Sequence, residues 1–257
     1  MSSAIIAVGD ELLAGFTLDT NSHWLAERLR LLGRPLKRVT QVRDRPEEIV
    51  EQLQRDLSDP DLDVLISTGG LGPTPDDRTY SAVAVALGRE LIVWEPVKER
   101  IEKRLKRMVE AGLIDSDELN EGHLRMASIP ARPAEVLGNR VGTAPALLYE
   151  VDGKQLYILP GVPAEMKAIF QEEIEPRLAG GSAASVRELR LRFAVEGRFY
   201  PVLSELERTH PDVSVGSYPN FETKLLTIRA SGADARRVDE ALSVVRRAAE
   251  AFGYTME

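Results

Sequence analysis

The chain has 257 residues, enough for one large or two modest domains. It carries 33 Lys and Arg against 41 Asp and Glu, and the formal net charge of −8 argues against a protein whose main role is coating nucleic acid. Cysteine is absent, which excludes disulfides, thiol nucleophiles, iron–sulfur clusters and zinc sites with cysteine ligands. No stretch reaches the about 18 apolar residues of a membrane helix and the N-terminal residues lack signal-peptide features, so we expect a cytoplasmic protein.

Strands and helices alternate through the first two thirds of the chain. Short apolar runs predict buried strands at 4–8, 36–42 and 63–68. Apolar spacing and stop signals predict helices at 21–32, 46–57 and about 77–87. This alternation of strand and helix predicts an α/β fold, a three-layer structure around a mostly parallel sheet.

Three further elements are predicted before the tail of the chain. A long charged helix follows Pro96, and its stretch Lys98–Arg107 is most economically a solvated helix face. The Asp152-Gly153 pair between two apolar runs predicts a hairpin with a two-residue turn. The segment LPGVPAEM, residues 159–166, then begins a helix that runs to about Leu178.

A linker is predicted at Gly180–Ser185, which is small, flexible and uncharged. We therefore expect a first domain at 1–178 and a second at 186–257. The order β–α–β–β–α in the tail predicts a smaller α+β domain. Its apolar strands must bury one face, so we expect a homo-oligomer, with a dimer favoured over larger assemblies.

The segment TGGLGPTPDD, residues 68–77, is the part of the sequence most suited to bind phosphate. Glycines allow backbone N–H groups to approach a ligand, and threonine hydroxyls can donate further hydrogen bonds. The candidate phosphate-binding residues are Thr68, Gly69, Gly70, Gly72 and Thr74. Asp76 and Asp77 would repel phosphate, and a divalent cation such as Mg²⁺ between them resolves this conflict. Either aspartate could instead cap the helix that follows.

Five motifs, in this order, resemble the superfamily of MoaB- and Mog-like molybdopterin-binding proteins and, more narrowly, the N-terminal region of the CinA family. They are GDELL (9–13), DTN (19–21), the glycine loop (68–77), NRVGTAP (139–145) and LPGVPAEM (159–166). The match covers about residues 4–175 and implies a MoaB/Mog-like fold followed by a small KH-type domain. Ala146 and Met126 depart from the CinA pattern, and the deamidase domain of that family is missing. The KH-like tail lacks GxxG, the element that clamps nucleic-acid backbones, so we expect no nucleic-acid partner.

The resemblance also implies roles for residues of this chain. Asp44 and Asp77 would be catalytic, and Asp76 with Asp77 would hold the metal. A small-molecule nucleotide or pterin would be bound by Gly9, Asp10, Glu11, Asn21, Thr68, Gly69, Gly70, Gly72, Thr74, Asn139, Gly142, Thr143, Pro160, Gly161 and Glu165. Asp44 could instead be a helix-entry residue, and Glu11 could be a cap.

The leading functional hypothesis is a pyrophosphohydrolase of ADP-ribose-like dinucleotides that depends on Mg²⁺ or another divalent cation. One alternative is a module that binds molybdopterin or a nucleotide without turnover. Another is an enzyme that transfers an adenylyl group to molybdopterin. No histidine is needed as a general base, and His123 and His210 are expected to be surface or structural residues.

Overall fold

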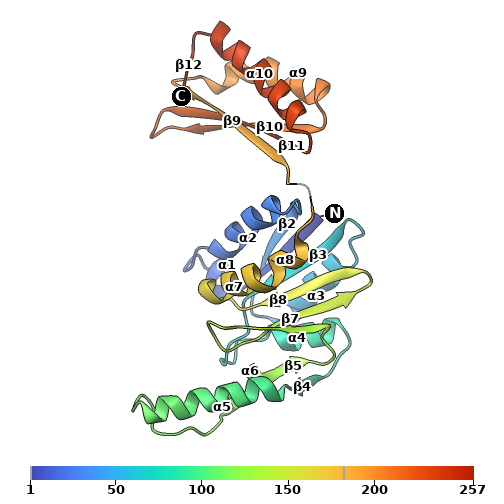
Figure 1. Ribbon diagram of the computed structural model, residues 1–257, viewed down its shortest axis with the longest axis vertical. Helices are drawn as coiled ribbons and strands as arrows, with labels where there is room; N and C mark the ends of the chain where they lie inside the picture. Colours follow the sequence, from blue (N-terminus) through green and yellow to red (C-terminus); the bar gives the residue numbers. More distant parts are fainter. Residues whose placement is uncertain (1, 182) are drawn as a thin grey trace. The chain divides into compact units, whose positions relative to one another are not determined.

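The computed structural model describes residues 2–181 and 183–257. The chain divides into two compact units, Met1–Gly181 and Ser182–Glu257, and the colours of Figure 1 follow the sequence from blue to red. The predicted linker Gly180–Ser185 includes Ser182, which lies outside the described residues. Among the described helices, none has the length and apolar character needed to cross a membrane.

The first unit is built on a six-stranded sheet in the order β2-β1-β3-β8-β7-β6. Its strands are β1 (Ser2–Val8), β2 (Leu36–Val42), β3 (Leu62–Thr68), β6 (Glu135–Leu137), β7 (Ala146–Val151) and β8 (Lys154–Leu159). Strands β1, β2, β3 and β8 are parallel, whereas β6 and β7 pair antiparallel. Asp152 and Gly153 have φ of 49° and 79°, as a two-residue hairpin turn requires. The predicted mostly parallel sheet and the hairpin are confirmed.

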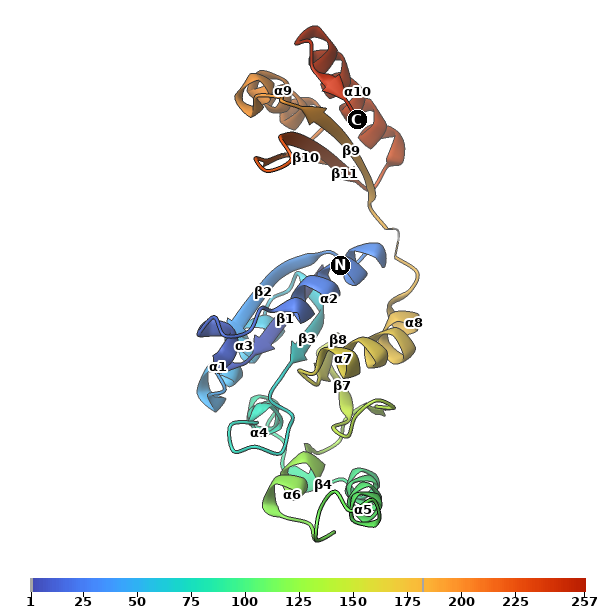
Figure 2. The same ribbon diagram turned by 90° about the vertical axis from the view of Figure 1, so that its left-hand side faces the viewer.

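Helices cover both faces of this sheet, as Figures 1 and 2 show. One layer contains α3 (Pro46–Leu57) and α4 (Thr79–Ala86), and the other contains α2 (Thr20–Leu31), α7 (Pro163–Ile169) and α8 (Glu175–Leu178). Residues 170–174 join α7 to α8 as one turn of π-helix. Leu53 and Val83 belong to the core on one face, and Leu25 and Ile169 belong to the core on the other. The predicted three-layer architecture is confirmed.

A lobe extends the first unit beyond α4 (Figures 1 and 2). It consists of β4 (Leu91–Val93), α5 (Glu95–Glu110), α6 (Glu121–Ala127) and β5 (Ser128–Pro130). Apolar side chains of α5 and α6 give it a small core of its own, made of Val97, Ile101, Leu105 and Ala127. The sequence predicted only α5. The strands β4 and β5 have three residues each, too few to show a period, and the seven-residue helix α6 was also missed.

The second unit is a smaller α+β fold, as predicted. Its antiparallel sheet has the order β10-β11-β9-β12 and packs with α9 and α10 around one apolar core. The elements are β9 (Ser185–Arg192), a 3₁₀ turn (Glu196–Phe199), α9 (Tyr200–Thr209), β10 (Val213–Asn220), β11 (Leu225–Gly232), α10 (Ala235–Ala251) and β12 (Thr255–Met256). Strand β9 ends at Arg192, because Phe193 adopts a positive φ of 54° that breaks the extended backbone.

The four parallel strands end at one edge of the first sheet. β1 and β3 are neighbours in the sheet. The chain continues from β1 to β2 on one side of this pair and from β3 toward β8 on the other side. Such a topological switch point is where α/β sheets bind ligands. Gly9, Asp44, Gly69 and Pro160 are found at or just past the ends of β1, β2, β3 and β8. The topology therefore collects the polar segments predicted to be functional at this edge.

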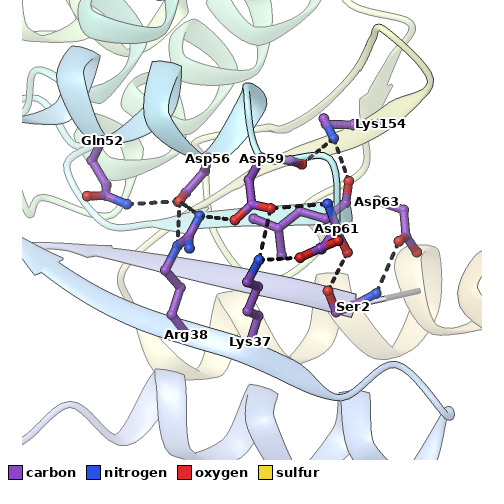
Figure 3. Close-up of polar contacts among 10 residues, drawn as sticks. Ser2, Lys37, Arg38, Gln52, Asp56, Asp59, Asp61, Asp63 and Lys154 are labelled. Carbon is purple, nitrogen blue, oxygen red and sulfur yellow. Dashed lines mark hydrogen bonds and ion pairs between the residues drawn. The ribbon is translucent and has the colours of Figure 1, made fainter.

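A polar cluster occupies the opposite edge, where the same strands begin (Figure 3). Lys37 Nζ lies 2.9 Å from Asp59 Oδ1, and Arg38 Nη2 lies 2.8 Å from Asp59 Oδ2. Arg38 also contacts Oδ1 of the fully buried Asp56 at 2.7 Å. Lys154 Nζ donates to the backbone oxygen of Asp59 at 2.7 Å. The cluster joins β2, the end of α3 and the start of β8.

We predict that Asp59→Asn lowers the stability of the protein at pH 7 and removes part of its acid sensitivity. The Lys37 ammonium and then the Asp61 N–H lower the pKa of Asp59 from 3.8 to about 2. The stability that this lowered pKa contributes is complete above about pH 4 and is lost as the pH falls toward 2. Thermal unfolding between pH 7 and pH 2.5 measures this contribution to stability. The difference in Tm between wild type and variant should shrink below about pH 4.

Asp61→Asn is the matched control for that experiment, because the Asp61 side chain is 73% exposed and, among the described residues, its ion pair is with Lys37. Its Tm should differ little from that of the wild type at every pH. A Tm difference for Asp59→Asn that stays constant over the whole pH range would contradict the prediction.

Candidate functional site

A cavity of about 750 Å³ lies between the glycine loop and the lobe. One wall consists of the glycine loop, which follows β3, and the segment 160–165, which follows β8. The opposite wall is largely apolar and comes from α5, α6 and the loop between them, with the side chains Ile101, Leu105, Met108, Ile114 and Met126. Ligand pockets of small molecules usually have about 300–1,000 Å³ and a similar mixture of polar and apolar walls.

Neighbouring atoms leave no room for side chains at the glycines of the loop. Gly69 has a φ of 107°, and a Cβ there would collide with the carbonyl oxygen of Val8. Gly70 has a φ of 67°, and its Cβ would collide with Thr79 Oγ1. A Cβ on Gly72 would lie 2.6 Å from Asp77 Oδ2. These glycines are therefore required by the packing of the loop itself, before any ligand is considered.

Thr79, the first residue of α4, fixes this loop. Its fully buried hydroxyl donates to the Gly69 carbonyl at 2.8 Å, and its N–H donates to the Gly70 carbonyl at 3.1 Å. In the described parts of the chain, the N–H groups of Gly70, Leu71 and Gly72 have no hydrogen-bond partner, and all three residues line the cavity. The loop thus holds unused backbone donors at the cavity wall, the arrangement that binds phosphate oxygens.

Asp76 and Asp77 differ in their surroundings. Asp77 lines the cavity, and its Oδ2 accepts hydrogen bonds from the N–H of Thr74, at 2.8 Å, and from the Thr74 hydroxyl. Asp76 is exposed and lies outside the cavity wall. Neither caps α4, whose N-cap is Arg78 without a side-chain hydrogen bond. The capping alternative is therefore wrong for both residues.

Asp44 stands in an acidic cluster beside the loop. Its Oδ2 accepts the N–H of Asp10 at 2.8 Å, and a Cβ on Gly70 would lie 3.5 Å from its Oδ1. Burial raises the pKa of Asp44 above 3.8, and the negative charges of Glu11, Asp10 and Asp76 raise it further, against the Asp10 hydrogen bond. Asp44 directly precedes Arg45, the N-cap of α3, so it does lie at the entry of that helix, although its carboxylate accepts the N–H of Asp10. No side chain caps α1 (Asp10–Leu13), so the capping alternative for Glu11 is wrong.

The donors of two predicted binding residues are used within the protein. The Thr68 hydroxyl donates to the Pro160 carbonyl at 2.9 Å, and Asn21 Nδ2 donates to the Gly161 carbonyl at 2.7 Å. Asn21 Oδ1 is buried without a partner among the described residues. These contacts join α2 and the end of β3 to the segment after β8, so Thr68 and Asn21 shape the cavity wall.

Asn139 organises the remaining wall. Its Nδ2 donates to Glu165 Oε2 at 2.6 Å, and its Oδ1 accepts the N–H of Gly142 at 2.7 Å. A Cβ on Gly142 would collide with the Glu165 carboxylate. Asn139 is only 4% exposed, so its amide forms a buried hydrogen-bonded link between the loop 139–143 and α7.

Two arginines of α5 reach the same loop, which sequence reasoning missed. Arg100 Nη1 donates to the Asn139 carbonyl at 3.1 Å, and Arg104 Nη1 donates to Thr143 Oγ1 at 2.7 Å. Glu99 and Lys103, four residues apart on this helix, form an ion pair at 3.6 Å as residues of a solvated face do, but the two arginine contacts show that the charged stretch 98–107 is not wholly solvated.

The predicted site residues fall into three groups. Those that line the cavity are Gly70, Gly72, Asp77, Thr143, Pro160, Gly161 and Glu165. Those that support its walls are Asn21, Thr68, Gly69, Thr74, Asn139 and Gly142. The third group lies outside the cavity wall, near the edge where the parallel strands end, and consists of Gly9, Asp10, Glu11, Asp44 and Asp76. His123, expected to be a surface or structural residue, lines the cavity and accepts the N–H of Asn120 through Nδ1 at 3.2 Å, in the capping box of α6.

Within residues 2–181 and 183–257, no three His, Cys, Asp or Glu side chains are arranged to hold a metal ion. Mg²⁺ commonly takes only one or two protein carboxylates and completes its shell with water and ligand phosphate oxygens. Asp77 lines the cavity and could supply one such carboxylate, whereas Asp76 is exposed and lies outside the cavity wall.

We predict that Gly69→Ala destabilises the protein far more than Gly88→Ala. Both glycines have positive φ, 107° and 60°, but a Cβ on Gly88 meets no atom within 4 Å. Gly88→Ala should therefore cost only the backbone strain, about 1–2 kcal/mol. Gly69→Ala adds the collision with Val8 and should cost at least about 3 kcal/mol. Denaturant unfolding of both variants measures this, and equal losses of unfolding free energy would contradict the packing that we describe.

Comparisons with known proteins agree with this architecture. The family described as probable molybdopterin binding domain matches residues 4–180. A protein of Pyrococcus furiosus is 38% identical over 247 residues, which cover 96% of both chains. A protein of Pyrobaculum calidifontis is 42% identical over 219 residues, 84% of this chain and 79% of its own. A crystal structure of CinA from Thermoplasma acidophilum is 34% identical with a TM-score of 0.60, and the match covers 69% of this chain and 97% of that one.

The second unit requires a correction. Residues 185–253 match the family described as FAD synthase, middle domain, so the expected KH-type domain is wrong. The order β–α–β–β–α is common to different small folds and could not separate them. The family of the first unit is nevertheless clear from its match over 4–180 and from relatives that align with nearly the whole chain. This chain belongs to the probable molybdopterin binding domain family.

Proposed function

We propose that the protein is a divalent-metal-dependent pyrophosphohydrolase of ADP-ribose-like dinucleotides. The observation that carries this proposal is the cavity itself, which has unpaired backbone donors and Asp77 at one wall and an apolar surface at the other. A dinucleotide has the matching parts, because a diphosphate suits the glycine loop and a flat heterocycle suits the apolar wall.

The proposed reaction breaks one phosphoanhydride bond. Water attacks a phosphorus atom of the diphosphate, the bond from that phosphorus to the bridging oxygen breaks, and ADP-ribose yields AMP and ribose 5-phosphate. The N–H groups of Gly70, Leu71 and Gly72 would hold the diphosphate oxygens and stabilise the charge that develops on them. Thr79 keeps these donors in place through its two hydrogen bonds to the loop.

Asp44 is the proposed acceptor of the proton from the attacking water. Burial and neighbouring negative charge raise its pKa, which makes its carboxylate a better base than an ordinary aspartate. Its position beside Gly70 places it next to the loop that would hold the diphosphate.

Asp76 and Asp77 are the proposed holders of the divalent cation. Bound there, the cation would offset the negative charge that these residues share with the phosphate and would act as a Lewis acid. Three carboxylates line the cavity, those of Asp77, Glu118 and Glu165, so an anionic ligand needs such compensation. Both hydrogen bonds from Thr74 go to Asp77 Oδ2, so Thr74 leaves Oδ1 available for this role.

We predict that Asp77→Asn lowers metal-dependent release of AMP from ADP-ribose by about 100-fold, the usual size for loss of one group that stabilises a transition state. The amide oxygen of asparagine can still accept the Thr74 hydrogen bonds, so the loop should keep its shape and the Tm should stay close to that of the wild type. Chromatography of products with Mg²⁺, Mn²⁺ or Co²⁺ measures the rate. Asp152→Asn, on the exposed β7–β8 turn, is the matched control and should be fully active.

Two outcomes would contradict the proposal. If the wild type releases no AMP from ADP-ribose, FAD or NAD with any of these metals, hydrolysis is not its function. If Asp77→Asn and the control are equally active, Asp77 only shapes the loop.

A second candidate function is binding of molybdopterin without turnover, which the description of the matching family favours. A pterin ring suits the apolar wall and its phosphate suits the glycine loop. Calorimetry distinguishes the two, because tight binding of molybdopterin together with an absence of nucleotide hydrolysis would favour this candidate.

A further inference from the structure

Arg104 is an unusual charge in the cavity. Among the described residues that line it, Arg104 is the one side chain with a permanent positive charge, and it faces a site with three carboxylates. No carboxylate lies within ion-pair distance of its guanidinium in the described part of the chain. The functions assigned above to the glycine loop and to the aspartates leave this charge unused.

The guanidinium of Arg104 is held by the wall of the cavity. Nη1 donates to Thr143 Oγ1 at 2.7 Å, and Thr143 is only 8% exposed. Arg100, one turn earlier on α5, donates to the Asn139 carbonyl and so ties the same helix to the same loop. Asn139 in turn binds Glu165 and Gly142, which gives the loop a defined shape.

The remaining hydrogen-bonding capacity of Arg104 is large. A guanidinium has five N–H donors in a planar fork, and the structure uses one of them, toward Thr143. The planar fork matches the paired oxygens of a phosphate, and such charge-assisted pairs are stronger than neutral hydrogen bonds. A group that is anchored at one nitrogen and open at the others loses little freedom when it binds an anion.

We propose that Arg104 is a specificity-determining residue that binds a phosphate oxygen of the ligand and that Thr143 is its positioning residue. The glycine loop holds one part of the diphosphate, and Arg104 recognises its anionic charge from the wall formed by α5. The site thereby prefers ligands with a diphosphate over nucleosides, which offer only the heterocycle and the ribose. This inference rests on the proposed function for the identity of the ligand.

Calorimetric titration of the full chain with ADP-ribose, AMP and adenosine tests the proposal. Arg104→Gln should raise the Kd of ADP-ribose at least tenfold and change the Kd of adenosine less than twofold. Thr143→Val keeps the shape of the side chain, removes the hydroxyl, and should raise the Kd of ADP-ribose about threefold. Arg107→Gln is the matched control, since Arg107 is an exposed arginine of α5 that does not line the cavity, and it should bind all three like the wild type.

A purely structural role of Arg104 predicts a different pattern. Arg104→Gln would then lower the Tm and weaken the binding of adenosine as much as that of ADP-ribose. That pattern, or an unchanged Kd for ADP-ribose, overturns the inference, as does a wild type that binds none of the three ligands. Suppose that Arg104→Gln weakens the binding of ADP-ribose selectively but the wild type hydrolyses nothing. The role of Arg104 would then be supported, and only the proposed hydrolysis would be refuted. If the wild type hydrolyses ADP-ribose and Arg104→Gln binds it with an unchanged Kd, only the proposed role of Arg104 would be refuted.

Discussion

The close approach of the glycine loop to the end of β1 is the constraint on which the candidate site depends. Gly69 packs against the carbonyl of Val8, and no other residue type can do so without displacing the loop. Thr79 then holds the loop from the other side, at the first residue of α4. Residues 70–72 line the cavity, and their N–H groups have no hydrogen-bond partner within the described part of the protein.

The lobe changes this sheet edge into a cavity. Strand ends alone would form an open groove, whereas α5 adds an apolar wall through Ile101 and Leu105 and polar contacts through Arg100 and Arg104. Asn139 connects these contacts with α7 through a buried hydrogen bond to Glu165. One helix therefore serves both as part of a small core and as part of the site, and its two kinds of side chain lie on neighbouring faces.

Local signals were strong enough to predict most of the first unit. The strand at 36–42, the helix at 46–57 and the Asp152-Gly153 turn depend on short-range patterns, and the structure has all three. The strands β4 and β5 have three residues each, too few for any period, and they form only because they pair with each other. The KH-type assignment failed because element order does not identify a small α+β family.

The chemistry of the site was harder to predict than the fold. An aspartate after a strand was visible at position 44, but its contact with Asp10 and its raised pKa depend on the pairing of β1 with β2. Arg104 had the pattern of a solvated helix residue, because no local pattern shows that a loop about 40 residues later will pack against it. Thr79 likewise looked like an ordinary residue inside a predicted helix.

The measurement that tests the central claim most directly is a crystal structure of the protein with Mg²⁺ and a non-hydrolysable analogue of ADP-ribose. The account predicts that the diphosphate lies against the backbone N–H groups of Gly70, Leu71 and Gly72, with the metal at Asp77 and the heterocycle on the apolar wall of α5. A ligand bound elsewhere, or one bound in the cavity with its diphosphate turned away from the glycine loop, would contradict it.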